Sequence, residues 1–377
     1  MAEEHDDKKQ NKKRSPLKRP SRRSALKQIM GLPVLGGLSA GFCCGSGLML
    51  EEAHLLAVEE AKKTAASSPA GAQAAVDGTT GATRLAWETE QLTTLKKQVP
   101  QGKIKDLQIS RLVLGGNLIG GWAHSRDLIY VSELIKRYHT KEKVFQTFRM
   151  AEKCGINTFM GNPVMYPMMS DYYTEGGGKI QFISDCGGRR SVKENMLEAI
   201  DHGCDACYVH GGQADRLVAE EKYDEIAQAF EAVRKNGVPV GLGAHFLETC
   251  LGVVKHGIVP DFWMKTYHTN NHYSALYGEG GTFVSKEFGK VVRTKGSYCP
   301  DAPAVRQFME NRPEPWIAFK VLAAGAIHPK QGFKHAFEGG ADFICVGIYD
   351  FQMIDDANLC NDILDGKLNR TRPWING

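Results

Sequence analysis

The sequence predicts a (β/α)8 TIM barrel that follows an N-terminal signal and linker extension. Two observations lead to this prediction: eight short apolar runs, and amphipathic helical segments that alternate with them. Parallel strands in such a barrel are buried on both faces, so their apolar runs are nearly unbroken. A third observation concerns Gly115 to Gly121, which does not match the G-x-G-x-x-G fingerprint that a doubly wound open sheet favours. The barrel is therefore preferred to the open sheet.

The expected elements alternate along the chain from residue 112 onward. Ser191 and Glu194 form a capping box at the start of one helix, and Gly155 and Gly237 end two others. The expected strands are 112–116, 156–160, 180–184, 206–210, 240–245, 262–268, 316–321 and 343–346. The expected helices are 142–154, 191–202, 222–236 and 302–311, with further helices after the seventh and eighth strands.

Composition is typical of a globular protein with a full-sized core. The chain has 377 residues, of which 42% are hydrophobic and 24% charged, with a formal net charge of +4. A dense run of Lys and Arg within the first 30 residues supplies that positive charge, and the remainder is close to neutral. The folded part therefore gives no electrostatic reason to expect nucleic-acid binding.

The basic run is similar to a bacterial twin-arginine export signal. Ser21 to Lys27 reads Ser-Arg-Arg-Ser-Ala-Leu-Lys, with Ala25 where the signal usually has Phe, and a Gly-rich stretch without charges follows over 29–50. The alternatives are a nucleic-acid-binding arm or a single membrane anchor. This similarity implies a periplasmic or otherwise exported protein that meets the export machinery and touches the membrane only through its signal.

Three regions are expected along the chain. Residues 1–50 form the signal segment, and 51–100 form a linker and N-terminal extension, rich in Ala, Ser, Gly and Thr over 64–81. Residues 101–377 form the barrel. An insertion over 269–296 is long enough to be a lid over the barrel mouth.

Three of the predicted strands end in a histidine: His210, His245 and His268. Neighbouring parallel strands end at the same rim of a barrel, where TIM-barrel enzymes keep their chemistry. Together with Asp185, these side chains could bind one divalent metal ion, Zn, Mn or Fe, and Glu248 is a spare acid or base. The alternative is a hydrogen-bonded polar network without metal.

Four segments resemble the aldo/keto reductases, and the resemblance spans 108–364. In that family an Asp, a Tyr, a Lys and a His form the catalytic set. Here Tyr166 and His210 match the Tyr and His, whereas Asn162 stands at the Asp position and Asp185 at the Lys position. The segments that carry the resemblance are 109–116, 144–159, 205–211 and 236–243.

These replacements weaken the expectation of hydride transfer. The resemblance implies a tyrosine acid whose pKa is lowered by the lysine, and a carboxylate at position 185 would raise that pKa instead. After the eighth strand, Gly347 and the following helix N-terminus could bind a cofactor phosphate, although Asp350 competes there. An NAD(P) cofactor is therefore possible but disfavoured.

Three functions remain open at this point. The preferred one is an exported enzyme that uses a metal and acid/base groups, as a lyase, isomerase or hydrolase, on a small polyol or oxo-sugar. Its candidate catalytic residues are His210, Tyr166, Glu248 and Lys320, the last as a base, an anion-binding group, a Schiff-base amine or a structural ion-pair residue. The alternatives are an NAD(P)-dependent oxidoreductase that keeps Tyr166 and His210, and a non-catalytic carbohydrate-binding protein.

Overall fold

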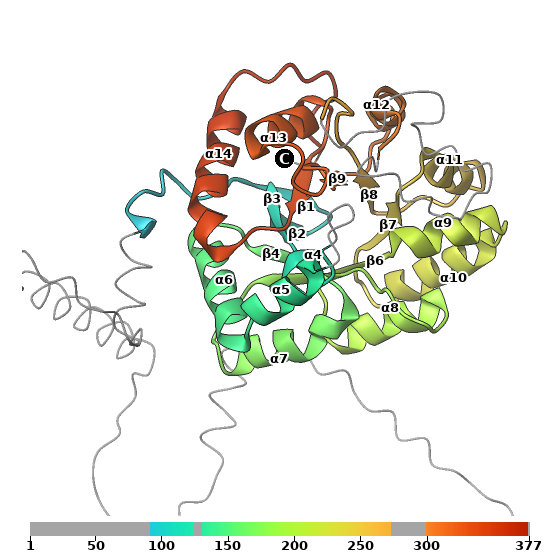
Figure 1. Cartoon of the computed structure of the whole chain (residues 1–377). Helices are drawn as coiled ribbons and strands as arrows, with labels where there is room; N and C mark the ends of the chain where they lie inside the picture. The colour runs from blue at the N-terminus through green and yellow to red at the C-terminus, as the bar shows by residue number, and fades with distance from the viewer. Residues whose placement is uncertain (1–90, 124–129, 273–298, 376–377) are drawn as a thin grey trace, which may run out of the picture.

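A computed structural model describes residues 91–123, 130–272 and 299–375 of the chain (Figure 1). The predicted signal segment, the linker as far as residue 90 and most of the predicted lid insertion lie outside these residues. None of the described helices is long and apolar enough to cross a membrane.

Eight parallel strands form a closed barrel in the order β10-β3-β4-β5-β6-β7-β8-β9. The first and last strands of the set pair through the register Ile344 to Leu112, which closes the ring. The prediction of a (β/α)8 barrel is therefore confirmed. The barrel strands are β3 (Leu112–Gly115), β4 (Thr158–Gly161), β5 (Gln181–Ser184), β6 (Ala206–Val209), β7 (Val240–Ala244), β8 (Phe262–Thr266), β9 (Trp316–Phe319) and β10 (Phe343–Val346).

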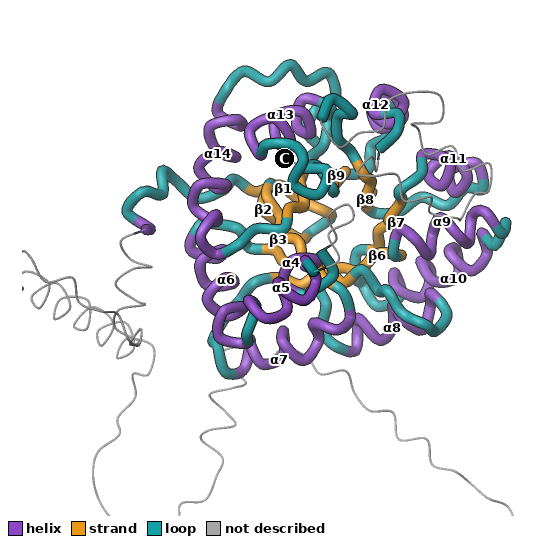
Figure 2. Tube along the Cα trace, viewed as in Figure 1, coloured by secondary structure: helices purple, strands orange, loops and turns teal. Residues whose placement is uncertain are grey.

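Helices surround the strands on the outside of the barrel, as Figure 2 shows. The described α-helices are α4 (Gly116–Ile119), α5 (Val131–Tyr138), α6 (Lys141–Lys153), α7 (Tyr166–Thr174), α8 (Val192–Asp201), α9 (Gly211–Ala219), α10 (Tyr223–Arg234), α11 (Leu247–Lys255), α12 (Ala302–Glu310), α13 (Pro329–Glu338) and α14 (Met353–Asp365). Two 3-10 turns, η1 (Pro163–Met165) and η2 (Asp350–Gln352), precede α7 and α14.

Two apolar layers hold these elements together, one inside the barrel and one between its wall and the helices. Met160 and Ile183 point into the interior, whereas Phe159 and Phe182, one residue earlier on the same strands, pack in the outer layer. This alternation follows from the two-residue period of a strand. Because both faces are covered, the strands read as continuous apolar runs in the sequence.

An antiparallel hairpin that the sequence did not reveal closes the N-terminal end of the barrel. It consists of β1 (Gln101–Ile104) and β2 (Leu107–Ser110). Ile104 and Ile109 are fully buried and join the interior layer. The opposite end of the barrel, where the strands finish, is the end at which TIM barrels carry their reactive groups.

The helix α9 was also not predicted, because Gly211 and Gly212 at its start are typical of a loop. The structure begins the helix at Gly211, directly after β6, and His210 acts as its N-cap. The predicted capping box of Ser191 and Glu194 is present at the start of α8. The position of α9 matters for the site, since this helix carries a buried aspartate to the barrel mouth.

Candidate active site at the barrel mouth

Four polar side chains follow four consecutive strands at the carboxyl end of the barrel. Asn162, Asp185, His210 and His245 each come one residue after the last residue of β4, β5, β6 and β7, respectively. On β4, β5 and β6 the residue two positions earlier belongs to the interior layer, so the strand period directs these side chains inward as well. We call these four residues the rim set.

Asp185 is held in place by donors from two loops. Its Oδ1 accepts a hydrogen bond from the backbone N–H of Gly187 at 2.8 Å and lies 3.2 Å from the amide nitrogen of Asn162. The residue is 7% exposed. Burial raises the pKa of Asp185 above its ordinary value, against the opposing effects of His210 and of these hydrogen bonds.

His210 is oriented by the helix that it caps. Its Nδ1 lies 3.2 Å from the backbone nitrogen of Gly212 and accepts that N–H. In the neutral ring the proton must then be on Nε2, which makes Nε2 a hydrogen-bond donor. The geometry therefore assigns His210 as a neutral donor at the rim.

His245 is oriented by a carboxylate. Its Nδ1 therefore donates a hydrogen bond, whereas Nδ1 of His210 accepts one. Nδ1 of His245 lies 2.8 Å from Oδ2 of Asp215, a side chain on α9 that is 3% exposed. Thr249 on α11 donates to the other oxygen of Asp215 at 2.7 Å, and the backbone N–H of His245 donates to the same carboxylate. Because Nδ1 carries the proton in this pair, Nε2 of His245 is the acceptor.

The surroundings of His245 favour the neutral form of its ring, chiefly because the ring is buried. Burial lowers the pKa of His245, Asp215 opposes that change, and the positive charge of Lys320 lowers the pKa further. The side chain is still 23% exposed. A neutral, accessible imidazole with its Nε2 lone pair available is suited to act as a general base.

Gly211 leaves the space that the ring of His245 occupies. A Cβ atom at this position would lie 2.9 Å from Cε1 and 3.0 Å from Nδ1 of His245. The ring centroids of His210 and His245 are 6.5 Å apart with an interplanar angle of 63°. The rim therefore contains one imidazole whose Nε2 is a donor and one whose Nε2 is an acceptor.

Lys320 follows β9 and adds an amine to the same region. The residue is half-buried, and its charge acts on His245. Burial lowers the pKa of Lys320 to about 8. The ring of the preceding residue, Phe319, lies 5.6 Å from that of His245, which places the end of β9 next to the rim set.

His268, the third strand-ending histidine, does not join the rim set. It lies two residues beyond the end of β8 and is fully buried, with Nδ1 2.9 Å from the backbone oxygen of Thr269. Its ring centroid lies 5.6 Å from that of His272. Burial lowers the pKa of His268 to about 4.

The metal site predicted from Asp185, His210, His245 and His268 stays a prediction, and His268 is not part of the rim set. Over the described part of the chain, no three or more His, Cys, Asp or Glu side chains are grouped as metal ligands. His210 also carries its proton on Nε2 in the assigned tautomer, and a ligand nitrogen must be deprotonated.

Tyr166, predicted from the family resemblance, is packed in the outer layer. Its hydroxyl lies 2.9 Å from Oγ of Ser184, and its ring stacks on His202 at 4.4 Å. Burial raises the pKa of Tyr166 well above its ordinary value. The structure therefore does not bring this hydroxyl together with the two rim histidines.

Glu248 and Gly347 also lie outside the rim set. Glu248 is exposed on the first turn of α11, where it lines a cavity of about 120 Å³ that Lys265 and His245 also line. Gly347 is exposed after β10. Asp350, expected to compete for a phosphate there, is buried instead and forms an ion pair with Lys143 at 2.9 Å.

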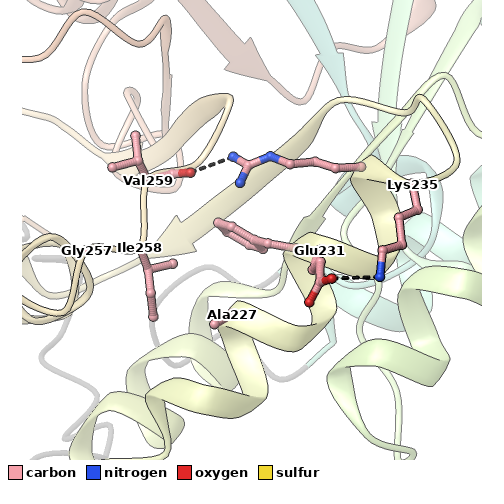
Figure 3. Close-up of a pocket in the computed structure, with 8 residues that line it drawn as sticks. Ala227, Glu231, Lys235, Gly257, Ile258 and Val259 are labelled. Atoms are coloured by element: carbon pink, nitrogen blue, oxygen red, sulfur yellow. Dashed lines mark hydrogen bonds and ion pairs between the residues drawn. The ribbon is translucent and has the colours of Figure 1, made fainter.

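A larger cavity, of about 420 Å³, lies at the other end of the barrel (Figure 3). It is formed by the end of α10 and by residues 257–259, which lead into β8. Arg234 donates to the backbone oxygen of Val259 at 2.6 Å, and Lys235 pairs with Glu231. None of the predicted site residues lines this cavity.

Asp215 is the important site residue that sequence reasoning missed. It lies on the buried face of α9 beside Ala214 and Leu217. A charged residue on a buried helix face is a recognisable signal, because Asp is rarely buried without a partner. The sequence analysis assigns no helix to residues 211–219, so this signal has no helix face to refer to.

Comparison with known proteins finds only distant similarity. No protein-family model matches the chain, and no curated protein matches it. Among solved structures, one named "Putative aldo-keto reductase from Pseudomona aeruginosa" matches at 15% identity and a TM-score of 0.46, covering 72% of this chain and 99% of that chain.

Two other solved structures have comparable scores. A truncated 3-deoxy-D-arabino-heptulosonate 7-phosphate synthase from Thermotoga maritima matches at 10% identity and a TM-score of 0.42, covering 73% of this chain and 97% of that one. A 7,8-dihydropteroate synthase from Vibrio fischeri matches at 12% identity and a TM-score of 0.39, covering 71% and 99%. Similarity at this level says nothing about the reaction.

Proposed function

We propose that this protein is an enzyme that moves a proton at a carbon next to a carbonyl group, in a small oxo-sugar or related hydroxy-carbonyl compound. The observation that supports this most is the 2.8 Å contact between Nδ1 of His245 and Asp215, with Thr249 on the second carboxylate oxygen. A base held in one tautomer by a buried carboxylate is a recurring element of acid/base catalysis. His210 supplies the complementary donor.

In the proposed reaction, Nε2 of His245 takes a proton from the carbon next to the carbonyl group. The resulting imidazolium is stabilised by Asp215, which keeps the proton on Nδ1 in place. Nε2–H of His210 donates to the carbonyl oxygen, where negative charge develops as the proton leaves. Return of the proton to the same carbon gives exchange with solvent. Its return to the former carbonyl carbon gives isomerisation, in which the proton of the adjacent hydroxyl group moves to the former carbonyl oxygen.

The other members of the rim set suit a hydroxylated substrate. The amide of Asn162 and the carboxyl group of Asp185 form a polar pair beside His210. Because burial raises the pKa of Asp185, this group holds a proton to a higher pH than an exposed aspartate does. It can therefore donate to a substrate hydroxyl or accept from one.

Exchange with deuterated water tests the proposal without knowledge of the final product. The purified protein is incubated in D₂O with glycolaldehyde, glyceraldehyde, dihydroxyacetone or erythrulose, and loss of the proton next to the carbonyl group is followed by NMR. We expect exchange above the rate without enzyme for at least one compound. A double variant, His210→Phe with His245→Gln, should lose it.

The control for this experiment is His256→Gln, at an exposed histidine that follows α11. It should exchange at the wild-type rate. The proposal is contradicted if the wild type exchanges no compound of the panel, or if the double variant exchanges as fast as the wild type.

We further propose export by the twin-arginine route, on the sequence of Ser21 to Lys27 alone. Expression of the full chain in a bacterium with this pathway, followed by cell fractionation, tests the proposal. The wild type should reach the periplasm, and the variant with Arg22→Lys and Arg23→Lys should stay in the cytoplasm. An equal distribution of the two proteins would contradict it.

A further inference from the structure

A small cavity lies beside His245, the proposed base. Its volume is about 120 Å³, and its lining comes from the start of α11, the start of α12 and the last turn of chain in β8. This volume equals that of about four water molecules in the liquid, so it admits a group of a few heavy atoms and not a long chain. The cavity therefore offers room next to the base for one end of a small ligand.

The lining combines apolar side chains with two carboxylates. Phe246 and Val305 are among the apolar residues, and both are buried. Glu248 is exposed on the first turn of α11. Asp301 is the N-cap of α12, where its Oδ1 accepts the backbone N–H of Ala304 at 2.9 Å. Apolar walls with a few polar groups are typical of sites for small molecules.

Lys265 also lines the cavity, but its hydrogen bonds are directed to the protein. The residue is 1% exposed, and its Nζ donates to the backbone oxygen of His245 at 2.8 Å and to the backbone and side-chain oxygens of Thr266 at 3.2 and 2.7 Å. These bonds use all three of its N–H groups. Two carboxylates and one ammonium group thus leave the lining with a net negative charge, and the ammonium group has no N–H left for a ligand.

We propose that this cavity holds the end of the substrate remote from the carbonyl group, and that it selects compounds without an anionic group. The inference rests on the proposed function, because His245 must reach the carbon next to the carbonyl group. The substrate class is then a short, uncharged hydroxy-aldehyde or hydroxy-ketone. A carboxylate has several acceptor sites, so Glu248 accepts from a substrate hydroxyl group, and Asp301 does the same while it caps α12.

The two helix starts do not make the cavity a site for anions. The first turn of a helix attracts negative charge because its N–H groups and its dipole point outward. Here each helix already has a carboxylate at that position, Glu248 on α11 and Asp301 on α12. A phosphate or carboxylate group of a ligand would be repelled by both, and such repulsion is a common source of specificity.

Binding of a matched pair of probes tests this inference. Glyceramide and glycerate have nearly the same shape and differ by one negative charge. Each is titrated into the full chain labelled with ¹⁵N at histidine, and the ring signals of His245 are followed by NMR. We expect both probes to shift these signals, with glyceramide binding at least about tenfold more tightly than glycerate.

Removal of the two carboxylates should reduce this preference. The double variant Glu248→Gln with Asp301→Asn should lower it at least about threefold, and Asn still caps α12. The matched control is Asp224→Asn with Glu225→Gln, which removes two exposed carboxylates from the first turn of α10, outside the cavity. The control should keep the wild-type preference.

Filling the cavity tests its place in binding independently of charge. Ala304 lines the cavity from α12, so Ala304→Leu should weaken the binding of glyceramide at least about tenfold. Ala227→Leu, in the larger cavity at the other end of the barrel, should bind glyceramide as the wild type does. Unchanged binding in Ala304→Leu would place the ligand elsewhere and overturn the inference.

The remaining outcomes separate this inference from the proposed function. Equal binding of the two probes, no shift at His245 with either, or the same change in preference in both double variants would overturn the inference. If exchange in D₂O depends on His245 but the probes bind without discrimination, the cavity is excluded and the proposed function stands. If glyceramide binds selectively in the cavity but no compound of the panel exchanges, the selective site stands and the proposed function fails.

Discussion

Two regions at the same end of the barrel contain histidines after neighbouring strands, and they differ in almost every property. In the rim set, His245 is partly exposed and bound to Asp215. In the region at the end of β8 and beyond it, which we call the buried cluster (Lys265, His268, His272 and Cys299), His268 is fully enclosed and contacts a backbone oxygen. A histidine at the end of a strand therefore acquires a chemical role from its hydrogen-bond partner and its exposure to solvent.

The largest expected effect is the loss of the carboxylate that orients the base. Asp215→Asn should lower kcat for proton exchange by about 100-fold, because the amide no longer fixes the tautomer of His245 or stabilises its charged form. The measurement is exchange kinetics by NMR. Asp261→Asn is the matched control, since Asp261 also accepts a backbone N–H but lies at the opposite end of the barrel; an equal loss there would refute the assignment.

For the buried cluster, the comparison predicts an effect on stability. The pKa of His268 is about 4 in the folded protein and near its ordinary value of 6.5 in the unfolded chain. As the pH falls from 6.5 to 4, the unfolded chain binds a proton that the folded protein does not, so stability falls. This difference in proton binding contributes up to about 3 kcal/mol to the free energy of unfolding at pH 7.

Urea unfolding at about pH 7 and pH 4.5 measures this contribution. The variant His268→Gln should lose less stability between the two pH values than the wild type, whereas His256→Gln, at an exposed position, should behave like the wild type. Parallel pH dependence in all three proteins would show that His268 is not buried in its neutral form.

A smaller effect is expected from crowding the ring of the base. A Cβ at Gly211 would lie 2.9 Å from the ring of His245, so Gly211→Ala should displace the ring and lower exchange by about tenfold. Gly212→Ala is the matched control, because its Cβ would lie 3.5 Å from His210, an ordinary contact. Similar rates in the two variants would count against the proposed position of His245.

The smallest predicted effects are shifts in the pKa of His245. Asp215 raises this pKa and Lys320 lowers it. Asp215→Asn should therefore move it down, and Lys320→Met should move it up, as observed by NMR titration of the ring nitrogens. Shifts of the same sign in both variants would contradict the electrostatic description of the rim.

The sequence predicts the barrel well because burial on both faces gives each strand an unbroken apolar run. It does not reveal the hairpin β1–β2, whose four-residue strands lack a recognisable turn signal. It also misses α9, because the two glycines at its start are explained only by the ring of His245 and the cap at His210. Patterns in the local sequence indicate which residues are buried. The hairpin β1–β2 and the helix α9 depend instead on contacts with residues distant in the chain.

The candidate site is predictable in part for the same reason. Every second side chain of a barrel strand points into the barrel. Asp185, His210 and His245 come next in this alternation on their strands, so the strand pattern predicts that they lie at the rim. His268 comes two residues after the end of β8. There the two-residue alternation of a strand no longer determines which way a side chain points. Lys320 itself has a left-handed backbone conformation, which amino-acid propensities do not predict for a lysine.

The most direct test of the difference between the two regions is to measure proton exchange in His245→Gln and His268→Gln side by side, at a pH near 7 with both proteins folded. The rim set is proposed to carry the chemistry and the buried cluster to carry only stability. His245→Gln should lose at least about 100-fold in kcat/KM, and His268→Gln should stay within about threefold of the wild type. A larger loss in His268→Gln than in His245→Gln would contradict this account.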